Sequence, residues 1–357
     1  ATILSTEEIK KKFKNTDFKI IDTGIKHGTV TLVLNHLKLE ITTLRKDVQT
    51  DGRHAEVEYI NDWKLDSERR DFTINAIYLN KKGKIFDPQQ GINDLKNNVV
   101  KFIGDPQTRI DEDFLRIIRF LRFTIQYNSP IENSTVRAIK LKLNGIKNLS
   151  KERILSELLK ILKLENFTKI IENKELIKIF ILIFPEFKNI YRLKNFDLLK
   201  NHTERSEILL LSVLLIDLKG NHEYFSHKYN ISKKIRENLD LLGNKYKEFQ
   251  YDKEFFKKNL KNNLYKVGLK NMKILLCLSL LDKKKFLTKE IHLFETMEKI
   301  SIPKFPFDGD FLIKKGIQEG KKIGIILKEA ETTWIQNDFV LSSSDFETII
   351  KKNKISN

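Results

Sequence analysis

The sequence predicts an α+β N-terminal domain followed by a long all-α region. Strictly alternating apolar and polar residues recur within the first hundred positions, between shorter helical patterns. After Pro106, apolar residues recur at helical spacing almost without interruption. A chain of 357 residues is too long for one ordinary hydrophobic core, so we expect two or more domains.

The N-terminal domain is expected to open with a helix and to continue into a β-hairpin. Ser5 and Glu8 have the spacing of a capping box, which starts a helix. The segments TVTLVL (29–34) and LKLEITTLR (37–45) alternate strictly on either side of a short polar turn. This pattern is typical of two strands joined as a hairpin.

The second strand of this hairpin predicts which side chains face the core. Successive side chains of a strand point to opposite faces. Leu37, Leu39 and Ile41 therefore share one face, which we expect to be the core face, and Glu40 points the other way. Glu40 is then either part of a solvated strand face or an acidic neighbour of a functional site.

A second hairpin is predicted a little further along the chain. AIYLN (76–80), the turn KKGK and IFDP (85–88) have the composition of two short strands around a glycine turn. Asp87 and Gly91 then suit a turn, and Asp94 follows in the next helix pattern. We interpret these three residues as mainly structural.

The remainder of the chain is predicted to be helical to about residue 300. Its clearest helical patterns are KERILSELLKILKL (151–164), HTERSEILLLSVLLI (202–216) and KKIRENLDLLGNKYKEF (233–249). A tail of different composition, FPFDGDFLIKKGIQEGKKIGIILKEAETTWI, begins at residue 305.

The charge balance indicates a polyanionic partner. The chain has 66 Lys plus Arg against 48 Asp plus Glu, a formal net charge of +18. Such a chain attracts nucleic acid. The abundance of Lys, Asn and Ile also fits a coding bias, which is the alternative explanation of the same charge.

Other composition features bound the class of protein. Cys277 lies inside the apolar run ILLCLSLL, and we expect a core residue in a reducing compartment, the cytoplasm. The seven histidines show no metal-ligand spacing, so no zinc site is expected. The longest apolar runs, such as residues 208–216, are far shorter than the roughly 20 residues of a membrane helix. We therefore expect no membrane span and no N-terminal leader.

The segment DSERRDFTINAIY (66–78) contains two adjacent arginines. Arg70 has Asp71 beside it and Asn75 five positions further on. Arginine offers a planar fork of donors that suits phosphate, and asparagine can fix a sugar or a neighbouring loop. The alternative is a surface ion pair or a helix cap.

The segment EDFLRIIRFLRF (112–123) places Asp113, Arg116, Arg119 and Arg122 at spacings of three, which we predict to lie along one helix. We call the three arginines the arginine strip. Three arginines in an enclosed cleft suit a triphosphate or an RNA backbone, and an aspartate beside an arginine can present an acceptor and donors to a base edge. The alternative is a solvated strip of ion pairs.

The apolar residues of the same segment indicate whether the helix has one exposed side or is packed against other elements on several sides. Phe114, Ile117, Ile118 and Leu121 form the expected core face. Phe120 and Phe123 fall outside that face, as does the leucine at position 115. We therefore expect the helix to be covered on more than one side, at a domain junction.

Several motifs, in this order, resemble those of the class II tRNA nucleotidyltransferases, which are the CCA-adding enzymes and their bacterial poly(A) polymerase relatives. The similarity is close over about residues 1–165. The motifs are GIKHGTVTLVLNHLKLEITTLR (24–45), RRDFTINAIY (69–78), DPQQGINDL (87–95), RIDEDFLRIIRFLRF (109–123) and SKERILSELLKIL (150–162).

The resemblance implies a fold and a reaction. It implies an α+β nucleotidyltransferase palm as a head, followed by an all-α neck, body and tail. These parts are expected at residues 1–104, 105–165, 166–240 and 241–357, with the tail binding tRNA. The implied reaction transfers CMP and AMP from CTP and ATP to the 3′ end of tRNA and releases pyrophosphate.

The resemblance also implies roles for single residues. Arg70 is expected to contact the incoming nucleotide, and Asp113 with Arg116 to bind the Watson–Crick edge of C or A. Arg119 and Arg122 complete the nucleotide-binding set. The implied supporting residues are Asp71, Asn75, Glu112, Glu152, Arg153 and Glu157.

The chain departs from the family pattern at its start. The family's palm begins with a Gly-Gly-x-Val-Arg-Asp loop and an Asp-x-Asp strand followed by Ala-Thr, and Ala1 and Thr2 are similar to that last pair. The two aspartates that hold Mg²⁺ for phosphoryl transfer are therefore expected upstream. Glu40 is the one candidate for an additional acid, so no metal ligand is assigned in this chain.

The departure leaves several explanations open. A short partner polypeptide supplies the missing segment, or the start is truncated or misassigned, or the protein is an inactive remnant. The alternative functions are a poly(A) polymerase of the same family and a catalytically inactive tRNA-binding or RNA-binding protein. The compact segment DGRHAEVEY (51–59) favours a CCA-adding enzyme over a poly(A) polymerase.

Overall fold

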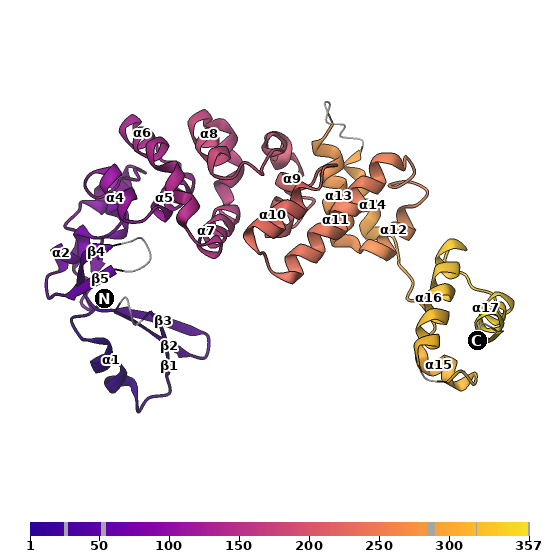
Figure 1. Cartoon of the computed structure of the whole chain (residues 1–357). Helices are drawn as coiled ribbons and strands as arrows, with labels where there is room; N and C mark the ends of the chain where they lie inside the picture. Colours follow the sequence, from indigo (N-terminus) through magenta and orange to yellow (C-terminus); the bar gives the residue numbers. More distant parts are fainter. Residues whose placement is uncertain (25–27, 51–54, 284–289, 319, 356–357) are drawn as a thin grey trace. The chain divides into compact units, whose positions relative to one another are not determined.

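The computed structural model describes residues 1–24, 28–50, 55–283, 290–318 and 320–355. Residues 51–54, in the segment DGRHAEVEY, thus lie outside the described residues. The described chain forms two compact units. Unit 1 contains Ala1–Asp197, Ser206–Leu215 and Glu223–Arg236, and unit 2 contains Leu198–Arg205, Ile216–His222 and Glu237–Asn357. Figure 1 labels the elements in chain order.

Unit 1 begins with a helix packed on a three-stranded antiparallel sheet. The elements are α1 (Thr6–Phe13), β1 (Lys19–Gly24), β2 (Thr29–Leu34) and β3 (Leu37–Thr42), with strand order β1-β2-β3. The predicted capping box is confirmed, since the Glu8 backbone N–H donates to Ser5 Oγ at 3.2 Å. Ile9 of α1 packs against Val30 and Leu32 of β2.

The prediction that Leu37 and Leu39 face the core is wrong. Their exposed fractions are 49% and 40%. β3 is an edge strand and α1 packs on β2, so the first four residues of β3 stay exposed. Ile41, closer to the helix, does pack at the margin of the cluster.

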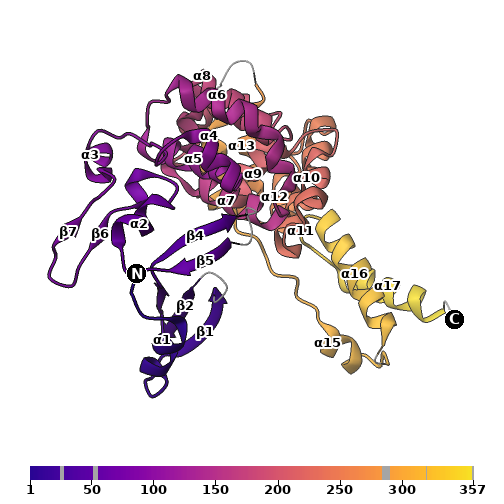
Figure 2. The ribbon, with the colours of Figure 1, turned by 60° about the vertical axis from the view of Figure 1, so that its left-hand side comes forward.

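The second half of the head holds the predicted second hairpin. β6 (Tyr78–Leu79) and β7 (Ile85–Phe86) pair antiparallel, as the sequence predicts (Figure 2). The other elements of this part are β4 (Arg45–Thr50), β5 (Ala55–Tyr59), α2 (Trp63–Glu68), the 3₁₀ helix η2 (Thr73–Asn75) and α3 (Gly91–Lys96).

The loop before α3 is structural, as predicted. The Asp87 carboxylate accepts from the backbone N–H groups of Gly91 and Ile92, both at 2.8 Å. Asp94 accepts from the Thr73 hydroxyl at 2.6 Å, which ties α3 to η2.

The rest of unit 1 is helical. Its elements are α4 (Pro106–Glu112), α5 (Leu115–Tyr127), α6 (Asn133–Lys142), η3 (Leu143–Asn148), α7 (Lys151–Lys163), η4 (Glu165–Glu172), α8 (Lys174–Ile183), η5 (Ile190–Leu199), α9 (Glu207–Leu215) and α10 (Asn221–Tyr229). The last two residues of η5 and the first two of α10 belong to unit 2.

The regular elements of unit 2 that the structure describes are all helices. Its helices are α11 (Lys233–Tyr251, from residue 237), α12 (Leu260–Val267), α13 (Leu269–Leu281), α14 (His292–Lys299), α15 (Gly309–Lys314), α16 (Lys321–Gln336) and α17 (Ser343–Ile355). Cys277 of α13 is a buried free thiol, as predicted.

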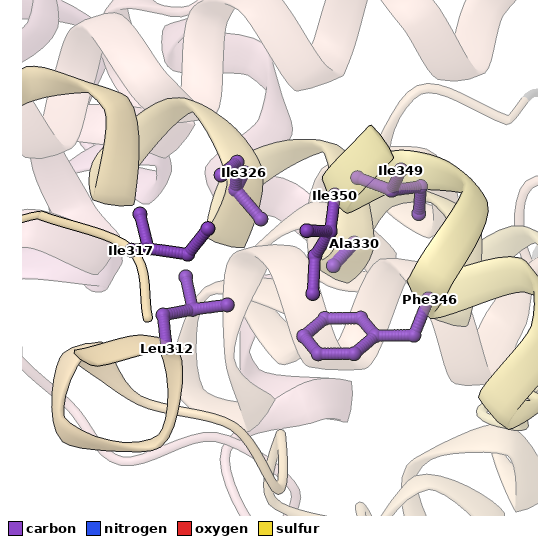
Figure 3. Close-up of a cluster of buried hydrophobic side chains, with 7 residues drawn as sticks. All are labelled: Leu312, Ile317, Ile326, Ala330, Phe346, Ile349 and Ile350. Carbon is purple, nitrogen blue, oxygen red and sulfur yellow. The ribbon is translucent and has the colours of Figure 1, made fainter. Parts of the chain in front are cut away.

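The three last helices share a small apolar core. Side chains from α15, from the turn that follows it, from α16 and from α17 point toward one another (Figure 3). The cluster consists of Leu312, Ile317, Ile326, Ala330, Phe346, Ile349 and Ile350. Among the helices that the structure describes, none is long and apolar enough to span a lipid bilayer.

Candidate nucleotide-binding site

The segment predicted as one helix over residues 112–123 is in fact two helices. α4 ends at Glu112, Asp113 has extended backbone angles (φ −159°, ψ 109°), and α5 begins at Leu115. Asp113 Oδ1 accepts from the Leu115 backbone N–H at 3.1 Å, the local bond with which aspartate competes against helix continuation. The prediction is therefore wrong at its start, and Asp113 lies at the junction of the two helices.

Burial along α5 agrees with the sequence pattern. Ile117, Ile118 and Leu121 are fully buried, whereas Phe114, at the N-cap of α5, is only partly buried. Phe120 and Phe123 are also buried, and Phe120 stacks on Phe102 of the head with ring centroids 5.5 Å apart. The prediction that this helix is covered on more than one side is confirmed.

Arg116 is held by three acceptors. Its guanidinium donates to the Glu112 carboxylate, to the Arg109 carbonyl at 2.9 Å and to the Arg69 carbonyl at 3.1 Å. Arg109 also donates to both oxygens of Glu112 at 3.0 Å. Glu112 therefore fixes the end of α4 against the first turn of α5.

Arg119 reaches from α5 to the arginine-pair motif of the head. Its Nε donates to Asp71 Oδ2 at 2.6 Å. Asp71 Oδ1 accepts from the Asn75 side chain at 3.0 Å and from the Phe72 backbone at 2.9 Å. The structure thus brings together Asp71, Asn75 and the middle residue of the arginine strip.

Arg122 is tied to the helix that follows. Its Nε donates to Glu157 Oε2 of α7 at 2.8 Å, and its guanidinium lies 4.0 Å from the Phe123 ring centroid. Glu157 is buried and also accepts from Lys160 at 2.7 Å. Burial raises the pKa of Glu157, but the hydrogen bond from Lys160 and the charges of Arg122, Lys160 and Arg119 outweigh it and hold this pKa below its ordinary value.

The remaining predicted residues fall into two groups. Arg153 of α7 donates to Asp113 Oδ2 at 2.7 Å, so it belongs to the site. Glu152 is exposed on the first turn of α7. Glu40 is exposed on β3 and ion-paired with Lys38 at 2.9 Å, which places it on a solvated strand face.

Two residues that sequence reasoning missed organise the arginine pair. Asp66 of α2 is fully buried and accepts from both Arg69 and Arg70. The Tyr78 hydroxyl donates to Asp66 Oδ2 at 2.8 Å. We call these four residues the Asp66 cluster. The helical spacing of an acid three and four positions before two arginines was a usable signal.

The carboxylates of the site do not fit a magnesium ion. Asp66, Asp71, Glu112, Asp113 and Glu157 each accept from at least one arginine. Within the described ranges, no group of three or more His, Cys, Asp or Glu side chains is placed to hold a metal ion. No chemical step is therefore derived through a metal on these residues.

Two sequence families match parts of the chain. The family described as "Poly A polymerase head domain" matches residues 1–101, and "Probable RNA and SrmB- binding site of polymerase A" matches residues 130–191. "CCA tRNA nucleotidyltransferase 1, mitochondrial" from Danio rerio is 31% identical over 364 residues, covering 97% of this chain and 80% of that protein. The Homo sapiens protein of the same name is 31% identical, covering 99% and 81%.

Solved CCA-adding enzymes share the fold. The Bacillus stearothermophilus enzyme in complex with CTP has a TM-score of 0.64 at 18% identity, covering 94% of this chain and 84% of that chain. A CCA-adding enzyme in complex with ATP has a TM-score of 0.63 at 20% identity, covering 99% and 84%. The Thermotoga maritima enzyme complexed with tRNA has a TM-score of 0.60 at 20% identity, covering 97% and 83%. The predicted α+β head followed by an all-α region is confirmed.

Proposed function

The chain belongs to the CCA tRNA nucleotidyltransferase family, and on that premise we propose that Asp113 and the arginine strip select CTP and ATP. CMP and AMP are then transferred to the 3′ end of tRNA with release of pyrophosphate. The observation that carries the proposal is that Arg116 donates to the Arg69 carbonyl and Arg119 to Asp71, which joins α5 to the arginine-pair motif of the head. Asp113 lies directly before α5 and accepts from Arg153 of α7. Such a set can read a base and neutralise phosphates together.

The concentration of arginine supports this assignment over coding bias. The chain has 13 arginines among 66 Lys plus Arg, and none occurs after Arg236. Seven of the 13 belong to the site: Arg69, Arg70, Arg109, Arg116, Arg119, Arg122 and Arg153. A lysine-favouring bias would have replaced arginines wherever a point charge was enough. Their retention here fits a need for the planar guanidinium.

Asp113 and Arg116 can read an edge that cytosine and adenine share. Both bases present an amino donor next to an accepting ring nitrogen, whereas uracil and guanine present the reverse order. The Asp113 oxygens accept from Leu115 and Arg153, and each oxygen has a second lone pair for an amino group. Arg116 has five N–H groups. Its three acceptors among the described residues do not use all of them, so an N–H group is left to donate to the ring nitrogen of the base.

Arg70, Arg119 and Arg122 are proposed to bind the sugar and phosphates. Side-chain exposure is 30% for Arg70 and 31% for Arg119, but only 15% for Arg122. Arg70 and Arg119 are therefore the more accessible members of the set, since the Arg116 side chain is 12% exposed. The proposed roles of Glu40 and Glu152 stay predictions.

The other parts of the proposal concern RNA, metal and compartment. The proposed head, neck, body and tail are residues 1–104, 105–165, 166–240 and 241–357. The lysine-rich tail is proposed to bind the phosphate backbone of tRNA. Mg²⁺ is the proposed cofactor of the complete site, and a segment or partner chain that supplies its aspartates stays a prediction. The cytoplasm stays the proposed compartment.

Nucleotide binding by the whole chain tests the proposal without requiring turnover. We expect CTP and ATP to bind more tightly than UTP and GTP in equilibrium titrations. Asp113→Ala should remove about 1–3 kcal/mol of that discrimination, because a bidentate base contact is lost. Asp111→Ala is the matched control, since Asp111 lies two positions away on α4 and pairs with Lys142 instead.

The same titrations separate the alternatives. A poly(A) polymerase would discriminate in favour of ATP alone, and a silent RNA-binding protein would bind tRNA without preferring any nucleotide. Discrimination that survives in Asp113→Ala would rule out the role assigned to this aspartate.

A further inference from the structure

The carboxylate of Asp66 is the most heavily used acceptor in the head. Oδ1 accepts from Arg69 at 2.9 and 2.6 Å and from the Arg45 backbone at 3.3 Å. Oδ2 accepts from Arg70 at 3.3 and 3.1 Å and from Tyr78 at 2.8 Å. A buried carboxylate with this many donors is held ionised, and charged hydrogen bonds of this kind fix the direction of the donors.

The two arginines on Asp66 differ in what else they contact. Arg69 is 15% exposed, and its Nε also donates to the Arg45 carbonyl at 3.0 Å. Its own carbonyl accepts from Arg116. Arg69 is therefore an internal brace between α2, β4 and α5, whereas Arg70, at 30% exposure, is the member that solvent and ligands can reach.

Tyr78 locks the orientation of Arg70 from the other side. Its hydroxyl accepts from Arg70 Nε at 3.2 Å while donating to Asp66, and the guanidinium lies 5.2 Å from the Tyr78 ring centroid. The Asn75 carbonyl accepts from Arg70 Nη1 at 3.3 Å. Asp66, Tyr78 and the Asn75 carbonyl thus hold the Arg70 guanidinium in place. Its remaining N–H groups therefore point in a defined direction.

We propose that Asp66 and Tyr78 are positioning residues, which hold the Arg70 guanidinium in one orientation for the incoming nucleotide. This inference rests on the proposed function, because it takes the nucleotide as the ligand of Arg70. Neither residue needs to touch the nucleotide. Because the Arg70 side chain is already oriented before the nucleotide binds, it loses less conformational entropy on binding. Asp66 and Tyr78 can change the affinity for the nucleotide in this way.

The ionisation of Tyr78 fits this role. Burial raises its pKa and the hydrogen bond to Asp66 adds to that rise, against the lowering effect of the Arg70 charge, so that the pKa is about 12. Tyr78 therefore stays a hydrogen-bond donor over the whole range from about pH 6 to pH 9.

A double-mutant cycle on the full chain tests the inference. We expect Tyr78→Phe to raise the dissociation constants of CTP and ATP by about two- to tenfold, the effect of one hydrogen bond. In an Arg70→Ala background Tyr78→Phe should have no further effect, because its action passes through Arg70. The fold-change should be equal at about pH 6 and pH 9.

Two further variants complete the design. Tyr224→Phe, at a tyrosine that is 61% exposed on α10, should leave both dissociation constants unchanged. Asp66→Asn should raise them more than Tyr78→Phe does, with circular dichroism used to verify that it folds.

The outcomes distinguish the inference from the function on which it rests. An equal effect of Tyr78→Phe with and without Arg70 would overturn the positioning role, as would a lowered melting temperature with unchanged affinity. If Asp113→Ala weakens binding but Arg70→Ala does not, the inference fails and the proposed function stands. If neither variant changes nucleotide binding, the proposed function itself fails.

Discussion

Glu157 is the single residue that connects α7 most directly to the arginine strip. It is 3% exposed, accepts from Arg122 and Lys160, and lies 3.9 Å from Arg119. Removing one member of a buried ion pair leaves the other members without a counter-charge. The packing of α5 against α7 is therefore expected to depend on this carboxylate being ionised.

We expect Glu157→Gln to lower the free energy of unfolding by about 2–3 kcal/mol at neutral pH, since charge-assisted hydrogen bonds are lost. Urea denaturation of unit 1, followed through Trp63, measures it. The second tryptophan, Trp334, lies in unit 2. The parent protein and the Glu157→Gln variant therefore both carry Trp334→Phe, so that the fluorescence reports on Trp63 alone. Glu152→Gln, exposed on the same helix, is the control and should change stability by less than about 0.5 kcal/mol.

The stability difference between wild type and Glu157→Gln should depend on pH in a defined direction. The native pKa of Glu157 is below its ordinary value of 4.5, so the ionised carboxylate stabilises the native state above that pH. This contribution is lost as the pH falls through the lowered native pKa. The stability difference between wild type and Glu157→Gln should therefore shrink below about pH 4.5, and a difference that grows on acidification would contradict the assignment.

At the residue scale the sequence identified the charged residues but not their partners. Arg119 pairs with Asp71 across 48 positions, and Arg122 pairs with Glu157 across 35. Helical spacing shows which side chains share a face, but it contains no information on which distant carboxylate meets them. The Asp66 cluster was missed for a related reason. Tyr78 lies on β6, 12 positions after Asp66, and only the fold of the chain between them brings its hydroxyl to that carboxylate.

At the element scale, Gly91 is a glycine position that has no room for a side chain. A Cβ at this first residue of α3 would lie 2.1 Å from the Thr73 backbone oxygen, which cannot rotate away. We expect Gly91→Ala to destabilise unit 1 by about 3 kcal/mol. Trp63 fluorescence in the Trp334→Phe background measures it.

Gly324 is the matched control for the same substitution. It lies inside α16, and apart from its own helix turn no atom of the described residues is within 4 Å of an added Cβ. Gly324→Ala should stabilise unit 2 by about 0.5–1 kcal/mol, because alanine loses less backbone entropy in a helix. Trp334 fluorescence in a Trp63→Phe background reports it, and equal effects at the two glycines would show that backbone contact is not the cause.

The elements themselves were largely predictable, and the exceptions have physical causes. Alternation and helical periodicity gave both hairpins and the helical region, because these patterns reflect burial along a single element. The break between α4 and α5 depends on one side chain, Asp113, bonding to the backbone, which periodicity does not register. The exposure of Leu37 and Leu39 depends on which strand α1 covers, a tertiary property.

At the scale of the whole molecule, the division into two units has no marker in the sequence. Between residues 198 and 237 the chain contributes alternately to unit 2 and unit 1. The apolar runs in both units have similar composition, and no Gly/Ser or Pro-rich linker separates them. Contacts between residues distant in sequence decide the membership of each segment.

The two kinds of cation are distributed differently along the chain, and this predicts two modes of binding. Arginine is confined to residues 45–236, whereas every basic residue from 241 to 357, histidine aside, is lysine. Arginine suits bidentate recognition of a nucleotide, and lysine acts as a point charge on a phosphate backbone. If the tail binds tRNA as proposed, that binding should be more salt-sensitive than nucleotide selection.

We expect the affinity for tRNA lacking CCA to fall at least about tenfold between 50 and 200 mM salt, because each neutralised phosphate releases counterions. The slope of log affinity against log salt, measured by filter binding, gives the number of phosphates engaged. Lys314→Ala with Lys321→Ala in the tail should reduce that slope by about 2, and Lys12→Ala on α1 should leave it unchanged. Asp113→Ala should also leave it unchanged, since it acts on the base. An affinity independent of salt would show that the charge of +18 is not directed at a polyanion.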